Sequence, residues 1–440
     1  MSRTVDFPRR VVITGLGVIC PLGITPDAVW QALAARRSGV AAIPESAGRL
    51  PISFAARAEK FTGDIDDFGP LDAGLKKAVR KALKLMCRES QMGVAAAERA
   101  LADSGLAADA RDPERSGVVF GADYMLTEPA EFSAAVADCA TDGGRFEYAR
   151  WGQQGLAQMS PLWLLKYLPN MPASHLAIYN DFRGPNNSIT HREASSNLAA
   201  GEAFRIIARG HADVMLTGAT GTRIHPMKSV HAAQLEQLAT NGHSPESASR
   251  PFDLNRTGMV LGEGAAALVL EELSRAEARG ARIYGEIVAT ASATSLDRRR
   301  IAHRDDACER AMRAALAEAG IAPAELGHIH AHGLSTTSGD EEEARAIGRV
   351  FGDAADRPPV TAAKSYFGNL GAAGGMVELI TSLLAQTYDR LFPILNYETP
   401  DPACPISAAA SDDVPPGDSF LNLSVTPQGQ ASCLIVRRYA

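Results

Sequence analysis

The chain has 440 residues, of which 46% are apolar and 22% are charged, the usage of a folded globular protein with a large core. Its 44 basic and 51 acidic residues give a formal net charge of -7, which excludes a general electrostatic affinity for nucleic acid or anionic bilayers. Six cysteines are scattered singly, without CxxC pairs. This usage predicts a cytoplasmic protein and argues against a disulfide scaffold or a structural zinc site.

The N-terminal segment has two interpretations. Arg9 and Arg10 precede an apolar run over residues 11–22, an order that secretory signals also show. The glycines and β-branched residues of that run favour a first buried strand instead. A helix is predicted next, because Thr25 suits its N-cap and Pro26 its first turn. No apolar stretch reaches the roughly 20 residues of a membrane-spanning helix.

Strand and helix patterns alternate along the rest of the chain, which favours an α/β fold with a parallel or mixed sheet. Two units are expected, over residues 1–275 and 276–440, with an irregular aromatic-rich cap or insertion at about 128–187. The predicted elements are, in chain order, helix 77–102, strand 116–123, helix 196–209, strands 212–220, 261–272 and 283–292, helix 305–319, strand 328–333, and helices 340–350 and 374–387.

A first candidate site lies where THREASSN leads into a helix of small residues. Small side chains let that helix be buried, so Glu193 at its start faces the positive end of the helix dipole. Such a position suits an anion. The alternative is a structural one, in which Glu193 complements the helix end or pairs with Arg192.

Two further motifs carry polar groups beside glycines. The first is IHAHGLSTTSGDEEEA, in which His332 ends a strand next to hydroxyl groups, where it can donate a hydrogen bond or exchange a proton. His328, His330 and His332 share one strand face without a carboxylate or Cys partner, so no metal is predicted. The second is TAAKSYFGNLGAAGG around Lys364 and Asn369, which lacks both common phosphate-binding patterns. Each motif alone also fits a structural role.

Five ordered segments together resemble the β-ketoacyl-acyl-carrier-protein synthase (ketosynthase) family, over nearly the whole chain. The resemblance implies a thiolase-like fold of two similar βαβαβ-type halves in a layered α/β/α/β/α core. The segments are RRVVITGLGVICPLG, GHADVMLTGAT, RPFDLNRTGMVLGEGAAALVLEE, HGLSTTSGDEEEA and KSYFGNLGAAGGMVEL.

The resemblance also implies a chemistry and its catalytic positions. The family condenses an acyl chain, held on a cysteine, with a malonyl group on acyl carrier protein, and two histidines polarise the malonyl thioester. Laid on this sequence, the cysteine falls on Glu193 and the histidines on His332 and Asn369, while Lys364 matches the family lysine. A carboxylate is a poor nucleophile toward a thioester, so the ordinary reaction is not expected. Whether burial raises the pKa of Glu193 or the helix lowers it stays open.

The resemblance assigns the remaining site residues. Asp340 and Glu343 organise the site, and Ser335, Thr336 and Gly429 contact the phosphopantetheine arm of acyl carrier protein, the one carrier group expected; no other cofactor and no metal is implied. Where the family has a glycine-rich gate, this chain reads NLSVTPQGQAS, a further departure from the catalytic pattern.

Three functions remain open at this stage. Retention of His332 and Lys364 favours an atypical enzyme that decarboxylates malonyl carrier protein or condenses without covalent capture. Loss of the nucleophile and the gate favours a catalytically inactive partner resembling a chain-length factor. A scaffold with Glu193 as a helix cap is the third. Acyl carrier protein is the expected partner, together with a homodimer or a heterodimer with a ketosynthase homologue, in which the strand at 212–220 resembles the family's pairing edge.

Overall fold

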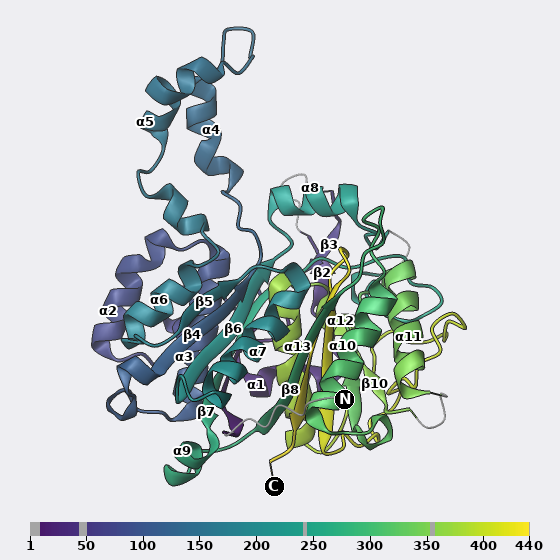
Figure 1. Ribbon diagram of the computed structural model, residues 1–440. Helices are drawn as coiled ribbons and strands as arrows, with labels where there is room; N and C mark the ends of the chain where they lie inside the picture. The colour runs from purple at the N-terminus through teal and green to yellow at the C-terminus, as the bar shows by residue number, and fades with distance from the viewer. Residues whose placement is uncertain (1–8, 44–50, 241–243, 353–356, 440) are drawn as a thin grey trace.

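The computed structural model describes residues 9–43, 51–240, 244–352 and 357–439. Its centre is one ten-stranded sheet in the order β10-β9-β11-β12-β8-β1-β7-β6-β4-β5 (Figure 1). The strands are β1 (Val11–Ile19), β4 (Ser116–Ala122), β5 (Asn186–Ile189), β6 (Val214–Thr222), β7 (Glu263–Glu272), β8 (Gly285–Thr294), β9 (His328–His330), β10 (Val360–Thr361), β11 (Ser419–Val425) and β12 (Gln430–Arg437). A separate ribbon pairs β2 (Val40–Ala42) with β3 (Phe54–Ala56).

The sheet consists of two halves with the same topology. From the centre outward, one half runs β1-β7-β6-β4-β5 and the other β8-β12-β11-β9-β10. In each half the two inner pairings are antiparallel and the two outer pairings are parallel. Within the sheet, the halves meet where Val11 to Ile13 of β1 pairs with β8. The chain thus repeats one supersecondary plan twice.

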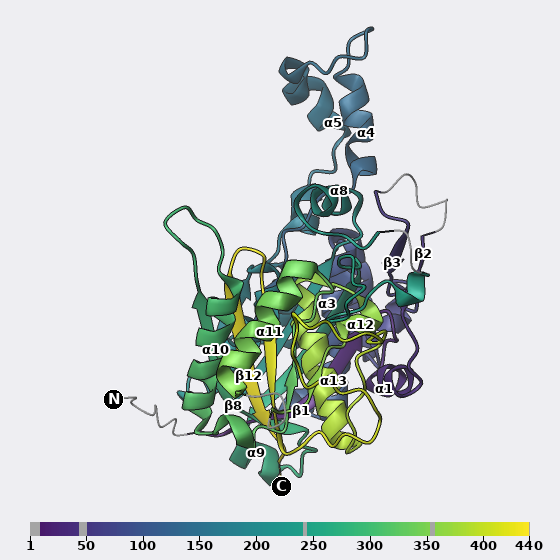
Figure 2. The same ribbon diagram turned by 90° about the vertical axis from the view of Figure 1, so that its right-hand side faces the viewer.

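Helices complete the layers on both faces of each half. Helix α3 packs outside the first half, α10 and α11 pack outside the second, and α7 and α13 meet between the halves (Figures 1 and 2). The helices are α1 (Pro26–Ala34), α2 (Ala73–Ala82), α3 (Arg88–Ser104), α4 (Pro129–Asp138), α5 (Leu156–Gln158), α6 (Met171–Asn180), α7 (Ser195–Ala208), α8 (Pro226–Leu235), α9 (Leu273–Ala278), α10 (Arg304–Ala319), α11 (Thr337–Phe351), α12 (Lys364–Phe367) and α13 (Gly374–Thr387). This arrangement confirms the expected layered α/β/α/β/α fold.

The central layer explains the small residues of α7. Ala199, Ala200 and Ala203 are fully buried there. A Cβ on Gly201 would lie 2.3 Å from Thr290 Oγ1 of β8, so only glycine permits this approach. The close packing of Gly201 against Thr290 fixes how α7 lies on β8. It therefore also fixes the position of the N-terminal turn of α7.

The local predictions near the N-terminus are confirmed. Val11–Ile19 is a fully buried strand, and Thr25 Oγ1 caps α1 by accepting the Ala28 N–H at 3.2 Å. The predicted helix over 77–102 is wrong as a single element, since a 3₁₀ turn at Leu83–Leu85 and an extended Met86 separate α2 from α3. None of the helices in the described ranges combines the length and hydropathy needed to span a bilayer.

The irregular region forms an arm that is shorter than the predicted cap. Helices α4 and α5 stand clear of the body in both views (Figures 1 and 2). In contrast, α6 and β5 belong to the core, because β5 pairs with β4 in parallel and α6 packs on α3. The region that projects from the core therefore ends before Met171 rather than at residue 187.

The expected pairing edge is also corrected. Strand β6, which the 212–220 motif forms, has β7 on one side and β4 on the other, so it offers no free edge. The open edge of this half is β5, whose residues 186 and 187 are exposed. Two strands that are distant in sequence, β4 and β7, occupy both sides of β6, and this arrangement cannot be read from the motif itself.

Candidate functional site

Glu193 lies at the turn that connects β5 to α7. A 3₁₀ turn over Arg192–Ala194 precedes α7, and Arg192 has φ of 50°, a left-handed conformation that is uncommon outside glycine. The Glu193 side chain is buried, with 1% of the residue exposed. Glu193 lies in a strained turn between the end of β5 and the buried helix α7. This arrangement places its carboxylate in the centre of the molecule.

Three side chains contact the Glu193 carboxylate. Arg223, at the end of β6, donates a hydrogen bond to Oε1, and Asn369 Nδ2 donates to the same oxygen at 3.2 Å. The Arg192 Nε atom lies 3.4 Å from Oε2. The alternative pairing of Glu193 with Arg192 is thus present, but a second, fully buried guanidinium accompanies it.

Two more carboxylates extend this ion cluster. Asp123 Oδ2 lies 3.5 Å from Arg223 Nη2, and Glu236 accepts a hydrogen bond from Arg192 Nη2 at 2.6 Å. We call Asp123, Arg192, Glu193, Arg223 and Glu236 the ion cluster. Burial alone would raise the pKa of Glu193, but the Arg223 and Arg192 guanidiniums lower that pKa to below its ordinary value. Glu193 is therefore a fixed anion near neutral pH.

His332 approaches from the second half, at the end of β9. Its Nδ1 lies 3.2 Å from Lys364 Nζ, which also donates to the His332 carbonyl oxygen at 2.9 Å and to Glu378. Burial and the nearby Lys364 charge lower the pKa of His332 well below its usual range, so the ring is neutral. Because Lys364 occupies Nδ1 as a donor, the ring proton is on Nε2, which is buried and has no partner among the described residues.

Asp340 and Glu343 of α11 hold the turn after His332. Glu343 accepts the backbone N–H groups of His332 at 2.6 Å and Gly333 at 2.8 Å, and Asp340 accepts that of Leu334 at 3.0 Å. Burial raises the pKa of Asp340 to about 6 and that of Glu343 to about 8. Both carboxylates bind backbone N–H groups of this turn.

Asn369 links the two halves at this point. Its Oδ1 accepts the Gly371 N–H at 2.9 Å, and its Nδ2 lies 3.4 Å from Met259 Sδ besides reaching Glu193. The structure thus brings Glu193, His332, Asn369 and Lys364 together, four residues that lie far apart in the sequence.

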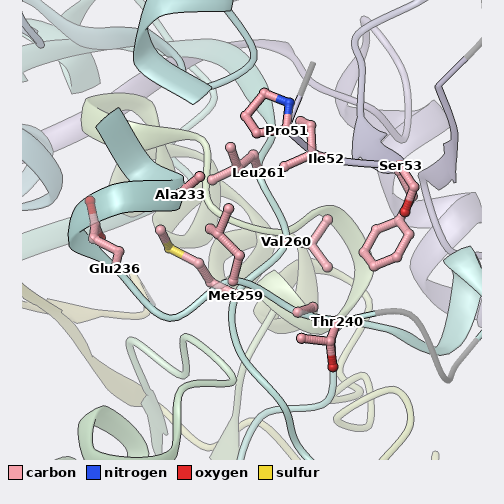
Figure 3. A pocket seen from close by; sticks show the side chains of 12 residues that line it. Pro51, Ile52, Ser53, Ala233, Glu236, Thr240, Met259, Val260 and Leu261 are labelled. Atoms are coloured by element: carbon pink, nitrogen blue, oxygen red, sulfur yellow. The ribbon is translucent and has the colours of Figure 1, made fainter. Parts of the chain in front are cut away.

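A pocket of about 840 Å³ lies in front of the ion cluster. Figure 3 shows Ile52, Val260 and Leu261 on its apolar wall, with Met259 and Glu236 together at one side. Since Met259 contacts Asn369 and Glu236 contacts Arg192, the pocket ends at the ion cluster. Its inner end is charged, because Glu236 lines it.

The residues predicted for the phosphopantetheine arm lie in two places. Thr336 precedes α11, and its Oγ1 is buried without a partner in the described part of the chain. Ser335, with φ of 67°, instead accepts the Arg250 N–H at 3.0 Å. Gly429 lies in the β11–β12 turn, where its carbonyl accepts the Ser295 N–H. The structure does not bring Gly429 into contact with the ion cluster.

Three residues of the ion cluster were not predicted from the sequence: Arg223, Asp123 and Glu236. A signal for Arg223 was present, because TGATGTRIHP places one cation directly after a buried strand. Asp123 and Glu236 carry no comparable local signal. Their role depends on where β4 and α8 end relative to Arg223.

Comparison with known proteins identifies the family. Residues 8–276 match Beta-ketoacyl synthase, N-terminal domain, and residues 284–398 match Beta-ketoacyl synthase, C-terminal domain. The chain belongs to the β-ketoacyl synthase family. This ketosynthase homologue is 36% identical over 402 residues to a 3-oxoacyl-[acyl-carrier-protein] synthase 2 of Coxiella burnetii, covering 90% of each chain.

Two solved structures resemble this ketosynthase homologue over 98% of its chain and 100% of theirs. One is the ishigamide ketosynthase/chain length factor, with a TM-score of 0.81 and 26% identity. The other is AntDE:AntF, a type II polyketide acyl-carrier protein in complex with its ketosynthase, with a TM-score of 0.80 and 26% identity.

Proposed function

We propose that this chain is the non-condensing member of a ketosynthase pair, a subunit resembling a chain-length factor that assembles with a cysteine-containing homologue. The observation that carries the proposal is the ion pair between Glu193 and Arg223, both almost fully buried. In this proposal Glu193 occupies the position of the family's nucleophilic cysteine. The nearest cysteine in the sequence, Cys139, is more than 50 residues away.

The ion pair is incompatible with covalent acyl transfer at residue 193. A nucleophile needs a free electron pair with high affinity for the acyl carbon, and Glu193 is a weakly basic anion whose Oε1 accepts bonds from Arg223 and Asn369. An apolar acyl chain that entered this space would displace or desolvate charges, a cost of several kcal/mol. The ion cluster therefore favours a structural role for Glu193 over a catalytic one.

The free surfaces of the chain support a paired subunit. Strand β5 offers an unpaired edge, the common site at which another sheet adds. The arm ends beside that edge, where Ser188 of β5 donates to the Pro169 carbonyl at 3.1 Å. Along the arm, Tyr148 is 79% exposed and Leu164 is 52% exposed. Such apolar exposure next to a free edge suits a homologous chain as partner.

A second function rests on a different observation, the donor geometry at His332. Its Nε2 proton is unpaired and Lys364 fixes that tautomer, so His332 can donate to a malonyl thioester oxygen. Loss of carbon dioxide would leave an enolate, which takes a proton to give the acetyl thioester. This decarboxylase needs no nucleophile at residue 193. It does need a second hydrogen-bond donor to the thioester oxygen, such as Asn369. The Asn369 amide, however, already donates a hydrogen bond to Glu193.

The decisive experiment co-expresses the chain with a cysteine-containing ketosynthase encoded by its genomic neighbours. We expect a 1:1 heterodimer by native mass spectrometry, and product formation that requires the partner's cysteine but not Glu193 or His332. The chain alone is incubated with malonyl acyl carrier protein, with His332→Ala as the matched control. Release of acetyl carrier protein by the wild-type chain, lost in His332→Ala, would establish the decarboxylase and reject the non-catalytic subunit.

A further inference from the structure

A small pocket of about 200 Å³ lies at the end of α13 that is remote from the ion cluster. Helix α13 begins shortly after Asn369 and has 14 residues, so about 20 Å of helix separate its two ends. In Figure 2 the strand β12 runs down to the C-terminus, whereas α8, β2 and β3 lie at the top. We call this space the arginine pocket. Its polar lining includes Arg282, Tyr284, Gln386 and Arg438.

Arg282 presents a guanidinium without a polar partner to the arginine pocket. Its guanidinium carbon lies 4.3 Å from the centre of the Tyr284 ring. The ring is held in turn by the Tyr284 hydroxyl, which donates to Asp103 Oδ2 at 2.9 Å. Within the described ranges Arg282 has no ion pair and donates no hydrogen bond. Because stacking on an aromatic face leaves the in-plane N–H groups open, Arg282 is a positioned cation that can bind a ligand.

Arg438 supplies a second guanidinium. Its Nη2 donates to Asp389 Oδ1 at 2.8 Å, and its buried Nε, which has no hydrogen-bond partner in the described part of the chain, lies 3.7 Å from Asp418. The side chains of Asp389 and Asp418 are 76% and 92% exposed, so solvent screens their charges. None of the described residues that line the pocket is a carboxylate. The arginine pocket therefore favours an anion.

The end of α13 does not oppose this anion with open carbonyl groups. The Leu384 carbonyl accepts the Tyr388 N–H at 2.9 Å, and the next carbonyl accepts the Arg390 N–H at 3.0 Å. What remains of the negative helix end is weaker than the attraction of two guanidiniums.

Gln386 adds a hydrogen-bond acceptor that has no donor. The residue is 4% exposed, and its Nε2 donates to the Gly417 carbonyl at 3.2 Å. This bond fixes the amide orientation, because the reverse orientation would place two acceptors against each other. The Gln386 Oε1 atom is buried and has no partner among the described residues. Since a buried carbonyl needs a donor, a ligand that fits must carry an O–H or N–H group beside its negative charge.

We propose that the arginine pocket binds a phosphate group that retains a proton, as free hydrogen phosphate or as a phosphate monoester. The anionic oxygens accept N–H groups of Arg282 and Arg438, and the P–OH group donates to Gln386 Oε1. Sulfate and phosphodiesters carry negative charge but no such proton, so they leave Gln386 unpaired. The volume of the pocket lies below the roughly 300 Å³ of sites for drug-sized ligands, which suits an ion or a small ester.

Isothermal titration calorimetry measures the binding of four probes to the full-length chain in the assembly in which it purifies. The probes are phosphate, glycerol phosphate, sulfate and dimethyl phosphate. At about pH 6, near the second pKa of a phosphate monoester, the first two retain a proton. We expect the tighter of these two to bind at least about tenfold more tightly than sulfate or dimethyl phosphate. The ratio of phosphate to glycerol phosphate affinity then distinguishes the free ion from a monoester as the ligand.

Two variants separate the acceptor from the charge. Gln386→Met removes the acceptor at similar side-chain length and should reduce the preference for phosphate over sulfate to within about twofold. Arg282→Gln should weaken phosphate and sulfate alike, by about tenfold each, because it removes charge and keeps the acceptor. Arg437→Gln is the matched control, with the same charge change at an exposed arginine that does not line the pocket. This control should bind phosphate within about twofold of the wild type.

Four results would overturn the proposal. They are no phosphate binding by the wild type, equal wild-type affinities for phosphate and sulfate, equal losses in Arg282→Gln and Arg437→Gln, and tighter binding of glycolate than of phosphate. Thermal unfolding shows whether Gln386→Met folds, since Gln386 is buried. Arg282 is exposed, so Arg282→Gln tests the arginine pocket whether or not Gln386→Met folds.

Discussion

The two halves of the molecule share one topology but differ in their chemistry. The second half keeps a neutral His332 with Lys364 and Glu378 behind it, a set that orients a hydrogen-bond donor. The first half, at the equivalent centre of the fold, carries Glu193 ion-paired to Arg223. Strand order and layers are the same in both halves. The two halves therefore show that this fold accommodates a buried ion cluster at its centre, because the charges of the cluster offset one another.

The outer edges of the two halves differ as well. Strand β10 has two residues and is flanked by a bridge from Val360 to Ala408. Strand β5 has four residues, and it leads into the turn that carries Glu193. The half with the ion cluster therefore also offers the open edge, which links its proposed structural role to assembly.

The largest expected effect comes from breaking the ion cluster. Arg223→Met should lower the free energy of unfolding by about 3 kcal/mol, because it leaves Glu193 and Asp123 buried with less compensating charge. Urea unfolding measures this change. Glu193→Gln combined with Arg223→Met should recover part of the loss, since both members of the pair are then neutral. A loss for the double variant equal to the sum of the two single losses would contradict the coupling.

The buried carboxylates of the two halves should give opposite pH dependence. Burial raises the pKa of Glu343 to about 8, so the native protein holds a proton that the unfolded chain releases above about pH 4.3. The stability from Glu343 is present below that pH and is lost as the pH rises through about 8. Glu193, with its lowered pKa, instead contributes above about pH 4.3 and loses its contribution as the pH falls.

Unfolding free energies from pH 4 to 9 test this contrast. The wild type should lose up to a few kcal/mol relative to Glu343→Gln over that range, and Glu193→Gln should remove stability mainly above pH 5. Parallel curves for the wild type and Glu343→Gln would show that Glu343 stays ionised in the folded protein.

A thiol at residue 193 tests the electrostatics of this site without restoring a condensing enzyme. Glu193→Cys places a buried cysteine at the start of α7 beside Arg223, which should lower its thiol pKa, as thiolate absorbance against pH measures. The wild type, whose six native cysteines are all buried, is the background control. Condensation of acetyl and malonyl carrier protein should stay absent, because Asn369 and the NLSVTPQGQAS segment still depart from the family pattern. Robust elongation by this single variant, followed by mass spectrometry, would show that those departures do not matter.

The smallest effect is expected at Thr336. Thr336→Val should change the free energy of unfolding by less than about 0.5 kcal/mol, because the hydroxyl has no hydrogen-bond partner in the folded chain described here. Ser335→Ala is the contrasting variant, since it removes the acceptor of the Arg250 N–H and should cost about 1 kcal/mol. Weaker carrier binding by Thr336→Val at unchanged stability would assign its hydroxyl to the prosthetic arm. A stability loss as large as that of Ser335→Ala would instead give the hydroxyl a structural role.

Much of the fold could be predicted from the sequence, because local patterns encode local structure. Thr25 and Pro26 set the start of α1, and the small residues around Gly201 required a buried helix. The ordered motifs gave the layered fold and the residues His332, Lys364 and Asn369. The break between α2 and α3 and the end of the arm escaped prediction, since both depend on how the segments pack on the core.

The position of Glu193 at the start of a buried helix follows from the sequence alone. Its ion pairing and charge depend on the folded chain, because Arg223 and Asn369, at the end of β6 and beside α13, approach it from distant parts of the sequence. The same holds for the open edge, which is β5 rather than β6 because strand neighbours are chosen by packing. Charge and pairing are properties of neighbours in space, whereas helix starts and strand periods are properties of neighbours along the chain.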